Sequence, residues 1–258
     1  MISKTAMLGL VKAFRSAEVD AALSENRALL AFRDERGRNW LHVCCGTKPA
    51  AAKRKDSIKT AEVLLRHGHD VDREAFTEGE WKATPLWFAI SRGENLDLAR
   101  FLLKRGCNPN YCLFAAGFRD DVEAIRLLAS HGADVNRPFD GESPLLGAIK
   151  WSHFRAAKAL LELGADPDYR DPSGMTALHY MLKKSSDRKH FEMMLAHGAR
   201  GDVANAEGVT AIDVLSRKKD LAFRRIAERL VRSEPRAAGA RAKKTASEGV
   251  VRRRPLRE

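Results

Sequence analysis

Apolar residues recur along the chain at the spacing of short amphipathic helices, and the same glycine stop follows many of them. In five segments a glycine follows a pair of apolar residues after two or three further residues. These segments are LLRHGHDVD, LLKRGCNPN, LLASHGADVN, LLELGADPD and MLAHGARGD. Their glycines are 38, 26, 32 and 34 residues apart and are Gly68, Gly106, Gly132, Gly164 and Gly198. This spacing indicates an internal repeat of about 33 residues with one insertion and one deletion.

Residues 159–182 contain one complete junction between two repeats. A helix rich in leucine ends at Gly164, which can adopt the left-handed conformation at little steric cost. An extended arm follows, and the sequence DPSG at 171–174 is typical of a tight turn. Thr176 then caps a second helix that begins ALHYML. The pattern therefore predicts pairs of helices joined by projecting arms.

Three units depart from this pattern. Residues 46–57, GTKPAAAKRKDS, are a basic insertion with a proline, and we expect a mobile loop there. The arm before Thr84 is four residues longer than the regular one. The arm before Tyr111 lacks about seven residues, so the next helix must begin almost at once.

The period, the turn, the helix start and the GAD that follows the second helix at 132–134 and 164–166 resemble the ankyrin repeat. The helix starts that carry this resemblance are TPLW at 84–87 and TALH at 176–179. The resemblance implies an all-α solenoid of stacked helix pairs with short β-hairpin arms. It also implies a concave face made by the arms and the first helix of each pair. Members of this family usually bind other proteins and have no catalytic site of their own.

The domain organisation follows from the repeats. We expect capping helices in residues 1–33, at 5–17 and 19–32 with a join at 18–20. About six repeats occupy residues 34–232, one with the insertion at 46–57 and one shortened at 111–136. Residues 233–258 lack apolar periodicity, and we expect a disordered basic tail.

The charge balance favours anionic partners. The net charge is +12 and the isoelectric point is near 9.8, and the tail from residue 233 on contributes +5 of that charge. The chain has no apolar run of the roughly 18 to 20 residues that span a bilayer, and no signal peptide is expected. The four cysteines do not suggest a disulfide scaffold. We therefore expect a cytoplasmic monomer.

Histidines invite a metal or acid–base interpretation, but their places favour structural roles. His67, His131 and His197 each precede a helix-stopping glycine, where a polar or positive group suits the negative end of the helix dipole. His42 and His179 stand at the last position of the helix start, where the resemblance implies a hydrogen bond near the turn.

The cysteines offer no second close pair for a zinc site, so we interpret Cys44, Cys45, Cys107 and Cys112 as buried free thiols. Signatures of nucleotide binding, serine hydrolysis and metalloprotease chemistry are absent from the sequence. We therefore expect no catalytic residue, no metal and no cofactor.

When the repeats are superimposed on their helix starts, two positions in each repeat fall at the end of the first helix. Cationic and aromatic residues gather there: Arg92, Phe118, Arg119, Lys150, Trp151, Lys183, Lys184, Arg217 and Lys218. We add three arm residues, Trp81, Phe139 and Met175, of which Met175 is expected to face outward. These cations could simply be solvated and favoured by the helix dipole, or they could line a groove for a partner.

Two functional hypotheses follow. The first is a non-enzymatic interaction scaffold that binds an acidic protein segment in the concave groove, with the aromatic residues as anchors. The alternative is a protein that associates with nucleic acid through the groove and the basic tail. For the tail itself we favour a role that only keeps the protein soluble, because no aromatic residues are interleaved with its charges.

Overall fold

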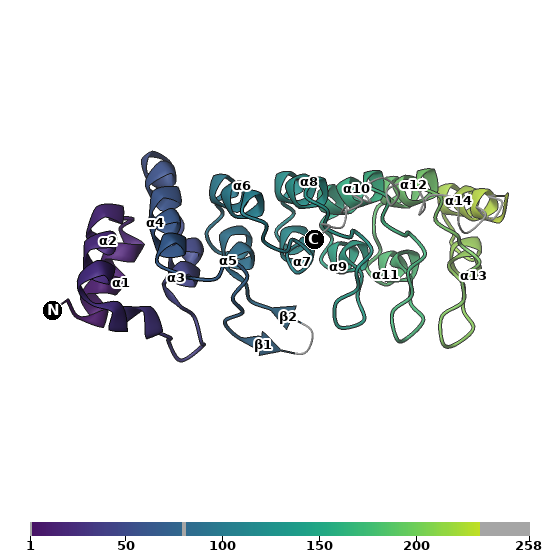
Figure 1. The fold of residues 1–258 in the computed structure, drawn as a ribbon. Coiled ribbons are helices and arrows are strands. Elements are labelled where there is room, and N and C mark those ends of the chain that lie inside the picture. Colours follow the sequence, from purple (N-terminus) through teal and green to yellow (C-terminus); the bar gives the residue numbers. More distant parts are fainter. Residues whose placement is uncertain (1, 79–80, 233–258) are drawn as a thin grey trace, which may run out of the picture.

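The computed structural model describes residues 2–78 and 81–232 as an elongated stack of helix pairs (Figure 1). The first helices of the pairs form one row and the second helices form another (Figure 1). The arms project from the row of first helices (Figure 1). The predicted basic tail at 233–258 lies outside the described residues.

The elements alternate between the two rows. The first helices are α1 (Lys4–Lys12), α3 (Trp40–Gly46), α5 (Pro85–Ser91), α7 (Leu113–Phe118), α9 (Pro144–Lys150), α11 (Ala177–Lys183) and α13 (Ala211–Ser216). The second helices are α2 (Ser16–Glu25), α4 (Arg54–Arg66), α6 (Leu96–Lys104), α8 (Val122–Ser130), α10 (Phe154–Glu162), α12 (Arg188–Ala196) and α14 (Leu221–Arg232). Two 3-10 helices, η1 (Arg27–Ala31) and η2 (Ala51–Lys53), and the antiparallel hairpin of β1 (Thr77–Glu78) and β2 (Trp81–Lys82) complete the described elements.

A continuous apolar core runs through the stack rather than sitting inside any one pair. In α5, for example, Leu86 and Ala89 are fully buried, and Phe88 and Ile90 are 1 % exposed. A short helix buried on nearly all sides needs neighbours on both flanks. The fold is therefore stabilised mainly by the interfaces between adjacent repeats, as in other linear arrays. Among the described residues, no helix is long and apolar enough to cross a membrane.

Side-chain caps start the first helices at the positions that the sequence predicts. Thr84 and Ser143 accept hydrogen bonds from the backbone N–H groups three residues on, and a proline follows each of them. In α3 and α11 the histidine joins the cap, because Nδ1 of His42 and of His179 accepts the backbone N–H of the capping residue. The Nε2 of each ring then donates to a carbonyl of the next arm, that of Arg73 at 2.7 Å and that of Val209 at 3.0 Å.

The predicted structural roles of these histidines are thus confirmed. His131 and His197 behave similarly at the other end of a helix. Their Nδ1 atoms lie 2.9 Å from the carbonyl oxygens of Leu127 and Met193, one turn earlier.

Two expectations about the N-terminal half are wrong. The join at 18–20 lies instead at residues 13–15, where the buried Phe14 takes a φ of 57° between α1 and α2. This break places Glu18 in the first turn of α2, near the positive end of that helix, and lets it pair with Arg15 at 2.8 Å.

The insertion at 46–57 is not a loop throughout. Residues 51–57 form η2 and the first turn of α4, which makes α4 the longest helix of the described chain, at 13 residues. Alanine, lysine and arginine favour helix, and they dominate this segment. The helix is also anchored at its start, because Ser57 is fully buried and its Oγ accepts a 2.9 Å hydrogen bond from Asn95.

Candidate functional site

The shortened repeat interrupts the row of arms. The link between α6, which ends at Lys104, and α7, which begins at Leu113, is too short to form an arm. The N-cap residue of α7, Cys112, makes no side-chain hydrogen bond to the helix. In Figure 1 the β1–β2 hairpin projects from the stack before α5 and another arm projects before α9, but no arm of the described chain leads into α7 itself. The aromatic side chains at the start of α7 therefore have no arm of their own to cover them.

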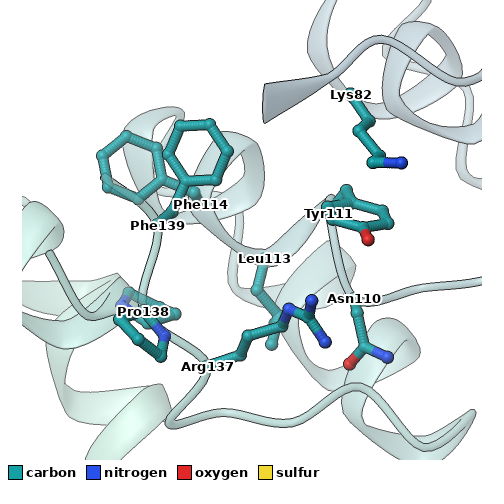
Figure 2. Close-up of a pocket in the computed structure, with 9 residues that line it drawn as sticks. Lys82, Asn110, Tyr111, Leu113, Phe114, Arg137, Pro138 and Phe139 are labelled. Carbon is teal, nitrogen blue, oxygen red and sulfur yellow. The ribbon is translucent and has the colours of Figure 1, made fainter. Parts of the chain in front are cut away.

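A small cavity occupies the place of the missing arm (Figure 2). We call it the notch. It has a volume of about 200 Å³ and lies between the β1–β2 hairpin and the arm before α9. Its walls are formed by Lys82, Tyr111, Phe114, Arg137, Pro138 and Phe139. The rings of Phe114 and Phe139 lie 5.8 Å apart at one side of it.

Two cations lie over the ring of Tyr111. The Lys82 ammonium is 5.5 Å and the Arg137 guanidinium 5.2 Å from the ring centroid, within the range of a cation–π interaction. Lys82 also pairs with Glu74 at 2.5 Å, and that hydrogen bond raises the pKa of Lys82. Arg137 is exposed and forms no ion pair with another described residue.

The notch adjoins a larger groove on the row of first helices. The groove has a volume of about 490 Å³, within the range of cavities that bind ligands. It shares Tyr111, Phe114 and Phe139 with the notch. Its remaining walls are Trp87, Ser91, Arg92, Ala115, Phe118 and Arg119. The groove is thus largely aromatic, with two arginines among its lining residues.

Two exposed aromatic side chains stand at the end of this groove. Phe118 is 48 % exposed and Trp151 is 55 % exposed, and their rings meet edge to face at 5.0 Å. Large apolar side chains that remain exposed as a pair mark interaction surfaces more often than isolated ones. The sequence predicts both residues as candidate anchors, and the structure brings them together.

A close approach of α7 and α9 holds the groove floor in place. A Cβ atom added to Gly147 would lie 2.7 Å from Cε2 of Phe114. The glycine therefore lets the Phe114 ring lie directly against the backbone of α9. His153 adds a second tie, because its Nδ1 lies 3.0 Å from the carbonyl oxygen of Gly117.

The predicted cations lie at or just after the ends of first helices, but several of them already have partners. Arg119 pairs with Glu94 at 2.9 Å and donates to the carbonyl of Ser91 at 3.2 Å. Lys184 donates to Ser152 Oγ at 3.3 Å. Arg92, Lys183, Arg217 and Lys218 form no ion pair among the described residues.

Lys150 is the most strongly engaged of the predicted cations. It pairs with Glu142, lies 3.8 Å from an Asp171 oxygen and 4.4 Å from the centre of the Tyr180 ring. The Tyr180 hydroxyl in turn donates to Asp171 at 2.6 Å. Burial opposes the charge of Lys150, but the bonds to Glu142 and Tyr180 outweigh it and raise its pKa. This network ties two arms together and leaves little of the charge for a partner.

The three predicted arm residues occupy different environments. Phe139 lines both the notch and the groove. Trp81 belongs to β2, and its side chain lies outside the described part of the structure. The expectation that Met175 faces outward is wrong. Its side chain is 8 % exposed, because the next arm covers it and Asn205 Nδ2 lies 3.6 Å from its sulfur.

Sequence reasoning missed Trp87, Tyr111 and Phe114. It compared equivalent positions at the ends of helices, whereas these three residues lie at the starts of α5 and α7. The signal that could have found them is the missing arm itself. When an arm is absent, the side chains that it would cover become a surface.

Comparison with known proteins places the repeats. A family model described as ankyrin repeats (three copies) matches residues 49–137 and 110–171. SH3 and multiple ankyrin repeat domains protein 1 of Homo sapiens is 33 % identical over 129 residues, which are 46 % of this chain and 6 % of that protein. Phosphocholine transferase AnkX of Legionella pneumophila is 28 % identical over 140 residues, 50 % of this chain and 14 % of that protein.

The fold comparison agrees. The ankyrin repeat domain of human ASB11 superimposes with a TM-score of 0.66 at 20 % identity, over 92 % of this chain and all of that domain. This chain spans only 6 % and 14 % of the lengths of these two larger proteins.

Proposed function

The chain is an ankyrin repeat protein, and we propose that it is a non-enzymatic scaffold that binds an acidic segment of another protein in the groove beside the shortened repeat. Ankyrin repeats generally mediate protein–protein interaction. The observation that carries the proposal is the missing arm, which leaves Tyr111, Phe114 and Phe139 around an open cavity. The exposed pair of Phe118 and Trp151 continues that surface.

The chemistry of the groove suits a polypeptide segment with one large apolar side chain. Aromatic walls in a groove of this size can surround such a side chain and remove it from water, which is how binding hot spots gain most of their energy. Arg92 and Arg137 stand at the edges of the cavities and can receive carboxylates on either side of that anchor. The partner segment is therefore apolar at its centre and acidic at its flanks.

The charge available to this segment differs from the simple basic stripe of the sequence. Lys150 and Arg119 are neutralised by Glu142 and Glu94, so they contribute to the fold and less to a partner. Reversing the charge of Lys150 would also leave Glu142 and the buried Asp171 without their cation. Variants that test binding should therefore leave Lys150 unchanged.

A selection of random 12-residue peptides against the whole chain tests the proposal. We expect the selected peptides to share an aromatic or large aliphatic residue with acidic neighbours. Phe118→Ala should weaken their binding by at least about tenfold, as expected when an aromatic side chain that the bound peptide covers is removed. The matched control is Leu221→Ala, which removes a 63 % exposed apolar side chain from α14, far from the groove along the stack (Figure 1).

The outcomes separate the hypotheses. Equal loss in Phe118→Ala and Leu221→Ala would contradict the proposed groove. Binding of single-stranded DNA at the same residues, stronger than that of any selected peptide and falling steeply with salt, would favour the nucleic-acid alternative instead.

A further inference from the structure

We propose that a run of carboxylates in the same protein partner occupies a basic cleft at the N-terminal end of the concave surface. This inference rests on the proposed function, because the cleft and the aromatic groove share Arg92. The cleft has a volume of about 760 Å³ and lies between α1, the arm before α3 and the end of α3. Its cations are Lys4, Lys12, Arg33, Arg36, Arg38 and Arg92.

Helix α1 presents one basic face to this cleft. Lys4, Leu8 and Lys12 are spaced four residues apart, so they lie along one side of the helix. The adjoining side carries Met7 and Val11, which are fully buried in the core. Both lysines are exposed, and neither forms an ion pair with another described residue. A helix that would otherwise only cap the stack thus lines the start of the concave surface.

The acidic residues of the cleft do not cancel its charge. Six cations line it together with two carboxylates, those of Asp34 and Glu35. Asp34 is committed to the arm, because its Oδ1 accepts the backbone N–H groups of Arg36 and Arg38 at 3.0 and 2.9 Å. Its other oxygen pairs with the Arg38 side chain at 2.6 Å. A net positive charge therefore remains for a partner.

Two arginines of the arm, Arg33 and Arg36, are held in place without being neutralised. Arg33 donates to the backbone carbonyls of Leu30 and Phe32, at 3.3 and 2.6 Å. Arg36 lies 6.0 Å from the centre of the Phe76 ring. Carbonyls and rings orient a guanidinium but carry no net charge to cancel it. The arm is consequently preorganised to bind carboxylates.

Protein carboxylates fit this cleft better than nucleic acid does. Binding of bases to single strands relies on free aromatic faces, but the Phe32 ring is already stacked on Trp40 at 3.7 Å. The other ring in the wall, that of His42, is held by its bond to the carbonyl of Arg73. The cleft also continues through Arg92 into the aromatic groove, so one extended polypeptide can follow both.

The structure therefore assigns a direction to the partner segment. Its apolar anchor lies between α5 and α7, and its acidic end runs toward α1. Electrostatic contacts of this kind speed association and fix the register of the bound chain.

Fluorescence anisotropy with fluorescein-labelled hexaglutamate tests the cleft on the full chain at low salt. We expect the double variant Lys4→Glu/Lys12→Glu to weaken binding by about tenfold or more. The matched control, Lys183→Glu/Lys184→Glu, makes the same change of charge at the end of α11 and should alter binding by less than about twofold. Should the glutamate variant melt at a lower temperature than the parent, Lys4→Gln/Lys12→Gln is used in its place.

Equal weakening in both double variants would overturn the inference, because it would mean that hexaglutamate responds only to net charge. Failure of hexaglutamate to bind would overturn it as well. Phe118→Ala should leave hexaglutamate binding unchanged while it weakens the selected peptides. The proposed function therefore stands if those peptides bind as expected, even where the acidic cleft fails.

Discussion

At the scale of single residues, His69 stands out among the repeat junctions. It follows a helix-stopping glycine, and the equivalent residues in four later repeats are Cys107, Ala133, Ala165 and Ala199. His69 is buried, at 8 % exposed, and its Nε2 has no hydrogen-bond partner in the described structure. Burial, aided by the positive charge of Arg33, lowers its pKa from 6.5 to about 4.

This shift predicts a loss of stability in mild acid. Unfolded His69 binds a proton near pH 6.5 but the folded side chain does so only near pH 4, so the unfolded state takes up more protons between these values. The contribution is intact above pH 6.5 and is lost as the pH falls toward 4. At about pH 5 the loss of unfolding free energy amounts to about 2 kcal/mol.

His69→Ala should remove this dependence. Both proteins are expected to lose unfolding free energy between about pH 7.5 and 5. In the variant this loss should be about 2 kcal/mol smaller than in the parent protein. Urea denaturation at the two pH values measures the difference. The exposed His131, changed to alanine, provides the control. An unchanged pH dependence in His69→Ala would show that the buried imidazole is not the group that titrates.

At the scale of elements, a buried amide joins the end of the insertion to the next repeat. Asn95 is fully buried, and its Oδ1 caps α6 by accepting the backbone N–H of Leu98 at 3.3 Å. Its Nδ2 donates to Ser57 Oγ in α4 at 2.9 Å. One side chain therefore both starts α6 and fixes the beginning of the extended α4.

Asn95→Ala should cost about 2 kcal/mol of unfolding free energy, because it removes a cap and a buried hydrogen bond together. The comparison is Asp121→Ala, which removes only the cap of α8, a 2.9 Å bond to the N–H of Ala124. That change should cost about 1 kcal/mol. Thermal or urea unfolding of both variants tests this prediction, and equal losses would mean that the bond to α4 contributes nothing.

The elements also show how far the sequence can be followed. Glycine stops and cap residues predict α8 and α11 at their observed bounds, because both signals are local. The sequence does not predict the start of α4, because the proline at 49 suggests a loop while the alanines and lysines after it favour helix. The burial of Met175 is not predicted for a different reason. Its exposure depends on the next arm, and neighbouring repeats are not visible in the local pattern.

At the scale of the whole molecule, the candidate site forms because one repeat of a regular array lacks its arm. Superimposing the repeats predicts Arg92, Phe118 and Arg119, and Phe139 is predicted as an arm residue; all four line the aromatic groove. It does not predict Tyr111 or Phe114, because a missing arm becomes a cavity only when the arms on both sides stay in place. The ion pairs of Lys150 likewise need two arms in their folded positions, the one that carries Glu142 and the one that carries Asp171.

Hydrogen exchange across the whole chain tests the central claim most directly. Mass spectrometry would compare the free protein with the protein saturated by a selected peptide. We predict slowed exchange in residues 85–92, 111–119 and 137–143, with further protection at 33–38 when the peptide carries an acidic end. Protection confined to the second helices, such as α6, α8 and α10, with no change at 111–119, would contradict the account.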